Sequence, residues 1–540
     1  MLMRKLFTLL LICTAGVSFG QNKYLVLFKD KTGSLYSVEK PEAFLSRRAI
    51  DRRNAQQIKI TEQDLPVSSA YLEALQERNI NVLYTSRWLN AVLVDVPESR
   101  LEEISALGFV KSIDGLFSHG LGGPNSRKGT KSLQDFSSFD AGSAQNQLEM
   151  LGADVMQTQG YTGKGVLIGL LDSGFSNANN LDVFKQLFEE NRVLETYNFV
   201  SNNISVYNAH SHGTSVLSCI AANLSGEMIG TAPEASFVLY VTEDVRSETR
   251  LEEVNWLIAA ERADSIGVDI IGSSLGYSDF EGTEQDYSYE DLDGNTALIS
   301  RAADWAASKG ILVVVSAGNE GNKAWKYITA PADADSVISV AAVDGNQNYA
   351  SFSSIGPSAD NQIKPEVAAK GLSTTVASPG NFVGFSNGTS FAAPLITGLV
   401  AGLKQAFPDL TAMELRQILL ESGSQYSEPD NLLGYGIPNF SRAYEMANLK
   451  KLKNSTDKPV LVFPNPSGKN EKLSVLITKE DLGNTFQVTL HSTNGILYYS
   501  GEFKRPYFDL PLTKSQLPTG IYILRIQNEL LNTTERVFIE

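Results

Sequence analysis

The ten residues from Gly165 to Gly174 read GVLIGLLDSG, an apolar run that ends in Asp172, Ser173 and Gly174. Strands that are apolar at every position are typical of a parallel sheet covered on both faces. Similar apolar runs follow along the chain at 235–242, 268–276, 311–319 and 336–343. Helical patterns lie between or after these runs, at 250–266, 295–309, 389–406 and 411–421. The alternation predicts an α/β domain with a doubly wound, mostly parallel sheet over residues 145–446.

The segments on either side of this domain have different patterns. Residues 21–118 contain strand-like and helical stretches in the order of an α+β split βαβ unit. Residues 119–144 are rich in glycine, serine and charge, and residues 447–460 are polar, so both are interpreted as linkers, the first of them cleavable. Residues 461–540 contain short strands, which predicts a C-terminal β-sandwich.

Length and composition limit the class of protein. The chain has 540 residues, 42% of them hydrophobic and 20% charged, with a formal net charge of −16. This acidic balance argues against non-specific binding to nucleic acid and suits a soluble extracellular protein. Residues 1–20 combine Arg4 and Lys5 with a short apolar core and a small-residue end, the pattern of a secretory signal peptide. No later stretch reaches the roughly 18 apolar residues that a membrane helix needs.

Cysteine usage indicates an exported chain without an intramolecular disulfide. Cys13 lies in the predicted signal peptide, so Cys219 is the only cysteine of the exported chain. A buried small hydrophobic residue is the favoured interpretation of Cys219, and a reactive thiol is the alternative. Stability must then come from large cores or bound ions.

A serine stands at the start of an apolar helical pattern in FSNGTSFAAPLITG, which spans Phe385 to Gly398. Proline costs about 3 kcal/mol in a helix interior but is tolerated near a helix start, so Pro394 predicts that the helix begins near Ser390. Free backbone N–H groups at such a start stabilise negative charge. Two interpretations of Ser390 remain at this point: an ordinary N-cap, or a nucleophile whose developing oxyanion meets those N–H groups.

Three further polar residues fall where open α/β sheets form sites, beyond the carboxyl ends of the strands. Asp172 and Asn319 each end a predicted strand, and His212 opens a predicted helix, whereas His210 is expected to be solvated. Each residue alone has an ordinary structural explanation in a turn or a helix start. A serine nucleophile, however, needs a base within reach and a carboxylate that orients the base. The convergence of these residues with Ser390 on one edge of the sheet favours catalysis.

The stretches that carry these residues resemble the catalytic domain of the subtilisin-like serine peptidases. The resemblance covers residues 145–446 and rests on GYTGKGVLIGLLDSG, HGTSVLSCIA, IIGSSLG, VVVSAGNEG, YASFSSIGP and GFSNGTSFAAPLITGLVAGL. The chain order Asp172, His212, Ser390 is that of the subtilisin triad. The resemblance implies that Ser390 is the nucleophile, His212 the general acid and base, and Asp172 the residue that orients the imidazole. It also implies that Asn319 helps the Ser390 N–H to bind the oxyanion.

The resemblance further implies where substrate binds. Ser274, Leu275 and Gly276 match the edge segment that pairs with the substrate backbone, and Ala317 and Gly318 lie where the family lines its first pocket. Backbone pairing tolerates many sequences. Small pocket residues leave room, so we expect a broad preference for apolar or aromatic side chains.

This chemistry requires no cofactor, and the sequence assigns no catalytic metal. The insert SDFEGTEQDYSYEDLDGN (278–295) holds Asp291, Asp293 and Asn295 at alternate positions that suggest calcium ligands. No complete twelve-residue loop follows, so a solvated loop is the favoured interpretation and structural calcium remains an open alternative.

The flanking segments resemble known modules as well. Residues 21–118 are similar in layout to subtilisin propeptides, which assist folding and block the cleft until they are cut. The tail carries FPNPSGK, STNGIL, LPTGIYILRI and RVFIE, and resembles the C-terminal sorting modules of Bacteroidetes type IX secretion cargo. An ordinary accessory β-sandwich that binds polysaccharide or protein is the alternative for the tail.

Together these interpretations predict a serine endopeptidase made as an autoprocessed zymogen and secreted, or held at the cell surface, by way of the periplasm. Its expected partners are protein or peptide substrates, its own propeptide as an intramolecular inhibitor, and the outer-membrane secretion machinery. Nucleic acid is not an expected partner, and we expect a monomer. The competing hypothesis is a catalytically silent surface protein that uses the same scaffold for binding.

Overall fold

The structure is a computed structural model that describes residues 22–117, 141–281, 283–468, 471–512 and 517–540. The signal peptide predicted at 1–20 and most of the linker predicted at 119–144 lie outside the described residues. Residues 141–144 are described, and Ala141 and Ala144 are buried. The folded domain therefore includes a few residues before position 145, where it was predicted to begin. The chain divides into two compact units between Ala443 and Tyr444.

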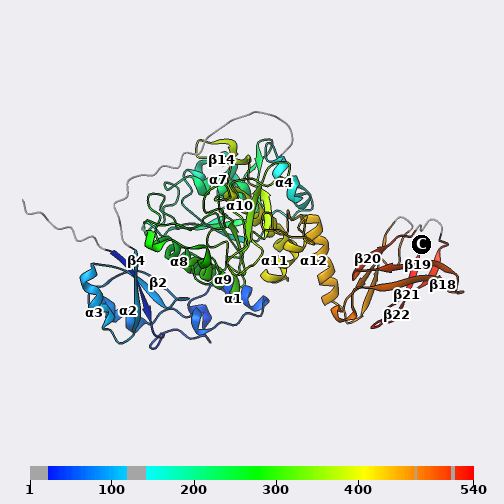
Figure 1. The fold of residues 1–540 in the computed structure, drawn as a ribbon, viewed down its shortest axis with the longest axis horizontal. Helices are drawn as coiled ribbons and strands as arrows, with labels where there is room; N and C mark the ends of the chain where they lie inside the picture. Colours follow the sequence, from blue (N-terminus) through cyan, green and yellow to red (C-terminus); the bar gives the residue numbers. More distant parts are fainter. Residues whose placement is uncertain (1–21, 118–140, 282, 469–470, 513–516) are drawn as a thin grey trace, which may run out of the picture. The chain divides into compact units, whose positions relative to one another are not determined.

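A seven-stranded sheet forms the centre of the first unit (Figure 1). Its strands lie in the order β13, β12, β11, β10, β5, β9, β6, and every neighbouring pair is parallel. The bounds are β5 Leu167–Asp172, β6 Val193–Asn198, β9 Ser236–Val241, β10 Ile270–Ser273, β11 Leu312–Ser316, β12 Ile338–Val343 and β13 Val367–Lys370. Every residue of β5, β10, β11 and β12 is buried, which explains their apolar sequences. The predicted doubly wound, mostly parallel sheet is confirmed.

Helices cover both faces of this sheet. α7 (His212–Ala221) and α10 (Thr389–Ala406) pack together on one face, and α8 (Leu251–Ile266) and α9 (Leu298–Ser308) pack together on the other (Figure 1). The smaller elements are α4 Gln145–Leu151, α5 Ala153–Thr158, α6 Lys185–Glu189, α11 Ala412–Glu421, the pair β7 Asn223–Leu224 and β8 Met228–Ile229, and the hairpin β14 Thr374–Ser378 and β15 Phe382–Ser386. Among the described residues, no helix is both long and apolar enough to cross a membrane.

Residues 22–117 form a separate antiparallel sheet in the order β2, β3, β1, β4. Leu75 and Ile104, from two of its helices, share one core with the strands. The elements are β1 Asn22–Phe28, α1 Arg47–Ala55, α2 Ser69–Gln76, β2 Asn81–Ser86, β3 Ala91–Val96, α3 Leu101–Ser105 and β4 Val110–Phe117. The order of strands and helices confirms the predicted split βαβ layout.

Three arginines of this N-terminal domain share one buried carboxylate of the parallel-sheet domain. Arg52 and Arg53 of α1, and Arg87 between β2 and β3, donate hydrogen bonds to Asp264 near the end of α8. Arg53 Nη2 lies 2.7 Å from Asp264 Oδ2, and both side chains are 0% exposed. Buried charges persist only where they are paired and hydrogen-bonded, so this cluster makes the contact between the two domains specific.

Helix α1 binds at the edge of the parallel sheet where its strands begin. Gln56 Nε2 donates to the carbonyl oxygen of Gly310 at 2.8 Å, just before β11. Arg48 Nε donates to the carbonyl oxygen of Gly267 at 2.9 Å, shortly before β10. This edge lies opposite the carboxyl ends of the strands, where Asp172 and Asn319 were predicted to meet.

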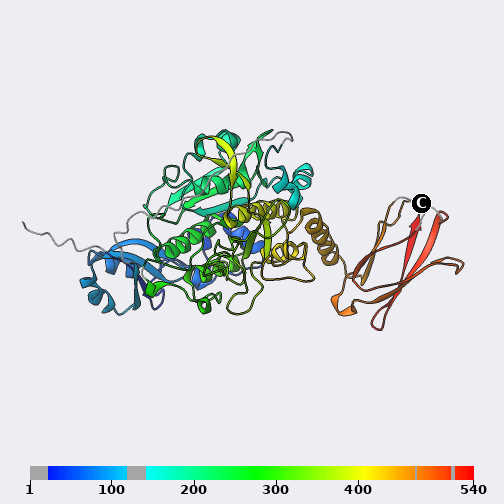
Figure 2. The same cartoon turned by 45° about the horizontal axis from the view of Figure 1, so that its top comes forward.

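The second unit is an antiparallel β-sandwich, as predicted for the tail. Its sheets have the orders β16, β17, β20 and β19, β18, β21, β22, and side chains of both sheets fill one core. Figure 2 shows its strands, coloured orange to red, running alongside one another. The bounds are β16 Val460–Phe463, β17 Leu473–Ile477, β18 Phe486–Ser492, β19 Leu497–Phe503, β20 Tyr507–Leu510, β21 Gly520–Gln527 and β22 Asn532–Ile539.

The segment before this sandwich differs from its predicted form. Residues 447–460 were predicted as a polar linker, but the chain is helical through Asn454 in α12 (Phe440–Asn454). Phe440, Ala443 and Ala447 are each 0% exposed, and their spacing of three and four residues is that of one helix face. The lysines among these polar residues are compatible with a helix because lysine has a high helix propensity.

Candidate active site

Asp172, the last residue of β5, holds the imidazole of His212 at the start of α7. Its Oδ1 and Oδ2 atoms lie 2.9 and 3.1 Å from His212 Nδ1. The Asp172 side chain is 1% exposed, and the backbone N–H of Ser173 donates to its Oδ1 at 2.7 Å. A carboxylate beside Nδ1 keeps the proton on that nitrogen, which leaves Nε2 as the basic atom of the neutral ring.

The first turn of α7 approaches β5 this closely because glycine follows His212. A Cβ atom at Gly213 would lie 2.5 Å from the carbonyl oxygen of Gly174 and 3.0 Å from the Cβ of Asp172. Neither neighbour can move away without displacing the aspartate or its turn. The pair His212–Gly213 is therefore a geometric requirement of the contact with Asp172.

The two neighbouring histidines have opposite electrostatic environments. Burial disfavours a charged His212 imidazole, but the Asp172 carboxylate and, more weakly, Glu243 outweigh burial and raise the pKa of His212 above its ordinary value. Partial burial and the nearby His212 lower the pKa of His210. A large part of His210 nevertheless remains exposed, and its Nδ1 accepts a hydrogen bond from the His212 backbone N–H at 3.3 Å. Only His212 is thus both oriented and made more basic by a carboxylate.

Ser390 is the second residue of α10, close to the predicted helix start, but Pro394 lies inside the helix rather than in its first turn. Proline lacks the N–H that would bond to the carbonyl oxygen four residues earlier, which is that of Ser390. The Ser274 hydroxyl replaces it, donating to Ser390 O at 2.9 Å, while Ser390 Oγ donates to Ser274 O at 3.2 Å. This role of the Ser274 side chain was not predicted from the sequence, although a proline four residues after Ser390 was its signal.

The Ser390 hydroxyl is therefore turned toward Ser274, and no hydrogen bond joins it to the described His212 ring. The ring of Phe391, the next residue, lies beside the imidazole with 5.7 Å between centroids. This contact brings the start of α10 to the same edge as His212. Catalytic hydrogen bonds are often long or poorly aligned without substrate and tighten only in the substrate complex.

The Asn319 side chain has a determined orientation. Its Oδ1 accepts hydrogen bonds from the Thr389 backbone N–H at 2.9 Å and from Thr389 Oγ1 at 3.1 Å. Because a backbone N–H can only donate, the atom facing it must be the amide oxygen, which leaves the Asn319 NH₂ group as a donor at the start of α10. The Ser390 N–H has no acceptor within the helix, since it belongs to the first turn. Two donors of this kind suit a developing negative charge.

The five residues predicted to bind substrate differ in exposure. Gly276 is exposed, whereas Ser274, Leu275, Ala317 and Gly318 are buried. The backbone N–H of Ala317 donates to a carbonyl of β12 at 3.1 Å, so this residue is part of the sheet. Gly276 thus offers accessible backbone beyond the end of β10, and the assignment of all five residues to substrate binding stays a prediction.

The acidic residues suggested as calcium ligands in the 278–295 insert bond to their own loop. Asp293 Oδ1 accepts from the backbone N–H groups of Asn295 and Thr296 at 2.8 and 2.7 Å. Asp291 Oδ2 accepts from the backbone N–H of Ser288 at 2.8 Å. Such bonds are ordinary turn and cap chemistry, which agrees with the solvated loop that was the favoured interpretation.

Three family models match the chain. They are described as the subtilase family, over residues 163–436, a Bacteroidota peptidase S8 propeptide domain, over residues 23–131, and a secretion system C-terminal sorting domain, over residues 461–540. Subtilisin DY of Bacillus licheniformis is 33% identical over 299 residues, which cover 55% of this chain and 97% of that protein. Serine protease AprX of Bacillus subtilis (strain 168) is 30% identical over 315 residues, which cover 53% and 67%. The solved structure of MycP1 from the ESX-1 type VII secretion system has a TM-score of 0.46 and 22% identity, over 59% of this chain and 91% of that chain.

Proposed function

Because this chain belongs to the subtilase family, we propose that it is a serine endopeptidase that hydrolyses peptide bonds with Asp172, His212 and Ser390. The observation that carries this proposal is the contact of the buried Asp172 carboxylate with His212 Nδ1, at 2.9 Å. The position of Ser390 at the start of α10, with Phe391 against the imidazole, supports it. A nucleophile, a base and a residue that orients the base are the parts that acyl transfer requires.

In the proposed reaction, Ser390 Oγ leaves the Ser274 carbonyl and attacks the carbonyl carbon of the scissile peptide, while its proton moves to His212 Nε2. Asp172 stabilises the imidazolium that results. The imidazolium then gives its proton to the leaving amine, and an acyl group stays on Ser390 Oγ. Water attacks this ester with His212 again accepting a proton, which releases the acid and restores the serine.

The negative oxygen of each tetrahedral intermediate would accept hydrogen bonds from the Asn319 NH₂ group and the Ser390 N–H. Thr389 supports this role, because it holds the Asn319 oxygen at 2.9 and 3.1 Å and so directs the amide nitrogen elsewhere. Donors that are already oriented need no reorganisation during the reaction, which is why such groups contribute strongly to catalysis.

The flanking domains support a zymogen that is secreted. The sorting domain at residues 461–540 indicates secretion across the outer membrane to the cell surface or the extracellular space. The propeptide domain, matched over residues 23–131, is consistent with an intramolecular partner that blocks the enzyme until it is cut. We expect the first cut within the predicted linker 119–144, made by Ser390 itself, and a later cut that removes the tail.

A fluorophosphonate probe tests the peptidase assignment directly. The processed protein should be labelled on Ser390, and the Ser390→Ala variant should not. A processed, folded protein that fails to react would overturn the assignment and favour the alternative of a catalytically silent surface-binding protein.

Intact-mass analysis tests the maturation scheme separately. Ser390→Ala should retain the propeptide if the cut is autocatalytic. Normal removal of the propeptide from this variant would instead show that a separate peptidase makes the cut. Exported wild-type protein that still carried residues 461–540 would contradict removal of the tail.

A further inference from the structure

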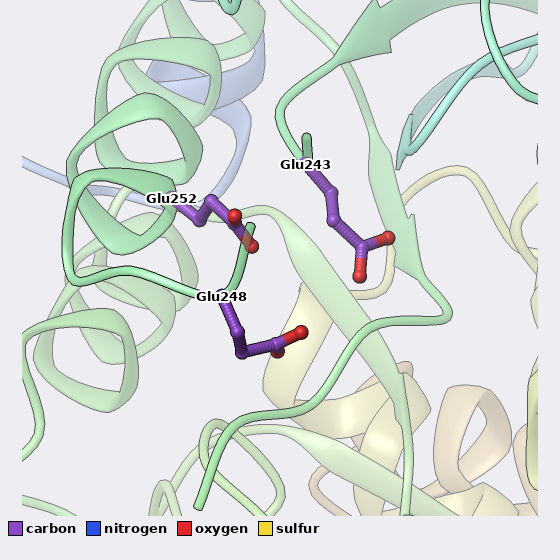
Figure 3. Close-up of side chains that lie close together, drawn as sticks. All are labelled: Glu243, Glu248 and Glu252. Carbon is purple, nitrogen blue, oxygen red and sulfur yellow. The ribbon is translucent and has the colours of Figure 1, made fainter. Parts of the chain in front are cut away.

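Three glutamates lie close together near the carboxyl edge of the parallel sheet. Glu243 follows β9, Glu248 lies in the loop after it, and Glu252 lies in the first turn of α8. Figure 3 shows the three side chains extending from these segments toward a common space. One carboxylate oxygen of each glutamate lies within 4.8 Å of those of the other two. We propose that Glu243, Glu248 and Glu252 bind a divalent cation of the size of calcium.

Glu252 provides the evidence that distinguishes this cluster from an ordinary acidic surface. Its side chain is 1% exposed, and neither of its carboxylate oxygens has a hydrogen-bond partner in the described part of the chain. An unpartnered buried carboxylate costs several kcal/mol in proteins unless a counter-charge is present.

The other buried acidic residues of α8 show what Glu252 lacks. Glu253 accepts from Arg250 at 2.8 Å and from Tyr287 at 2.7 Å. Glu261 accepts from the backbone N–H groups of Arg87 and Trp88, and Asp264 accepts from three arginines. Each of these carboxylates therefore has cationic or amide donors within hydrogen-bond distance, whereas both carboxylate oxygens of Glu252 lack a hydrogen-bond partner among the described residues.

The cationic side chains of the loop are engaged elsewhere. Arg246 donates to Asp244 at 2.8 and 2.7 Å. Arg250 pairs with Glu253 and stacks on the Tyr287 ring, 3.9 Å from its centroid. Neither arginine donates to Glu252, whose carboxylate oxygens have no hydrogen-bond partner among the described residues.

The spacing and the neighbouring polar atoms suit calcium. Oxygens on opposite sides of Ca²⁺ lie about 4.6–5.2 Å apart, so three carboxylate oxygens within 4.8 Å of one another can reach one such ion. Two further buried hydroxyls, those of Tyr277 and Thr242, have no hydrogen-bond partner among the described residues. Thr242 directly precedes Glu243, the first of the three glutamates. Water ligands of a bound calcium ion would supply partners for such hydroxyls.

A cation at this position would tie the end of β9 to the start of α8. The backbone N–H of Thr242, next to Glu243, donates to the carbonyl oxygen of Asp172 at 3.0 Å. The carbonyl oxygen of Glu248 accepts from the backbone N–H of Glu281 at 2.7 Å, which joins the loop to the 278–295 insert. The ion would therefore hold the loop and the insert in place next to the residue that orients His212. This inference does not depend on the proposed peptidase activity.

Calcium titration of the full-length Ser390→Ala protein tests the proposal without self-cleavage. The protein is freed of metal with EDTA and titrated with Ca²⁺ by calorimetry, as are Glu248→Gln and Glu252→Gln in the same background. Glu290→Gln, at an exposed glutamate of the insert, is the matched control. Both cluster variants should bind one Ca²⁺ fewer than the parent, and the control should bind as many as the parent.

Urea unfolding gives a second readout that a misfolded variant cannot imitate. At a Ca²⁺ concentration 100-fold above the dissociation constant, the site should shift the unfolding equilibrium of the parent about 100-fold further than that of Glu252→Gln. In EDTA, Glu252→Gln should be at least as stable as the parent, which shows that it folds. Equal Ca²⁺ binding by the parent and Glu252→Gln, or no binding by the parent, overturns the proposal. Glu252-dependent binding of tetralysine without Ca²⁺ binding also overturns it, and assigns the cluster to a basic peptide side chain.

Discussion

Replacing Asp264 with asparagine should loosen helix α1 from the parallel-sheet domain. The substitution preserves side-chain size but removes the negative charge that Arg52, Arg53 and Arg87 share. Arg53 and Asp264 are both 0% exposed, so water cannot take the place of the lost carboxylate. Breaking a buried ion pair by removing one partner costs about 3–5 kcal/mol. At about 1.4 kcal/mol per factor of ten, local opening of the contact should become about 10²–10⁴-fold more favourable.

Hydrogen exchange of the full-length Ser390→Ala protein measures this opening directly, because amides of α1 exchange when the helix detaches. Asp51→Asn is the matched control, since Asp51 lies on the same helix and pairs with Arg47 in an exposed contact, with side chains 53% and 84% accessible. Exposed pairs of this kind contribute about 0–1 kcal/mol, so α1 should exchange at nearly the parent rate in that variant. Protection of α1 that fell by less than about threefold in Asp264→Asn would refute the reasoning.

Three further predictions concern the candidate site and the helix α7, which carries both His212 and Cys219. Asn319→Ala should lower kcat about 10²–10³-fold with little change in KM, which is the magnitude known for the loss of one oxyanion donor in subtilisin. If steady-state kinetics showed that kcat fell by less than about threefold, the role assigned to Asn319 would be contradicted. Because Asp172 raises the pKa of His212 and the neutral ring is the base, kcat/KM should fall as pH drops through an apparent pKa above the ordinary 6.5. A pH profile whose acidic limb lies at or below 6.5 would argue against this coupling. Cys219 is 0% exposed, and burial raises the pKa of its thiol. Iodoacetamide should therefore modify Cys219 only after the protein unfolds, which mass spectrometry would detect. Rapid labelling of Cys219 in the native protein would contradict its burial.

The parallel sheet could be predicted from local sequence because each central strand is buried on both faces. GVLIGLLDSG became β5, and the apolar run at 311–319 became β11, since no polar position interrupts either strand. The boundary after residue 446 could not be predicted in the same way. Phe440, Ala443 and Ala447 are buried on one face of a helix, and the polar residues that follow them continue this helix. Whether these three residues are buried depends on tertiary packing, which cannot be inferred from the local sequence.

The candidate site was predictable in its members and not in its contacts. Asp172, His212 and Ser390 stand in local motifs that specify a strand end or a helix start. The bond from the Ser274 hydroxyl to the Ser390 carbonyl arises because Pro394 lacks an N–H, and joins segments 116 residues apart. The sequence alone could not identify Ser274 as the donor, because only the folded structure places the end of β10 beside α10.

Helix α8 explains why the candidate cation site was overlooked. In TEDVRSETRLEEV (242–254) the glutamates alternate with arginines and polar residues, as they do in exposed loops. The helix is covered by the N-terminal domain on one side and by α9 and the sheet on others, so nearly all of its first fourteen residues are buried, acidic ones included. Each buried carboxylate then needs a partner from a distant segment, and Arg87 and its neighbours supply partners to Glu261 and Asp264. Glu252 has none among the described residues, and the two acidic neighbours that it does have increase its need for a cation rather than meet it.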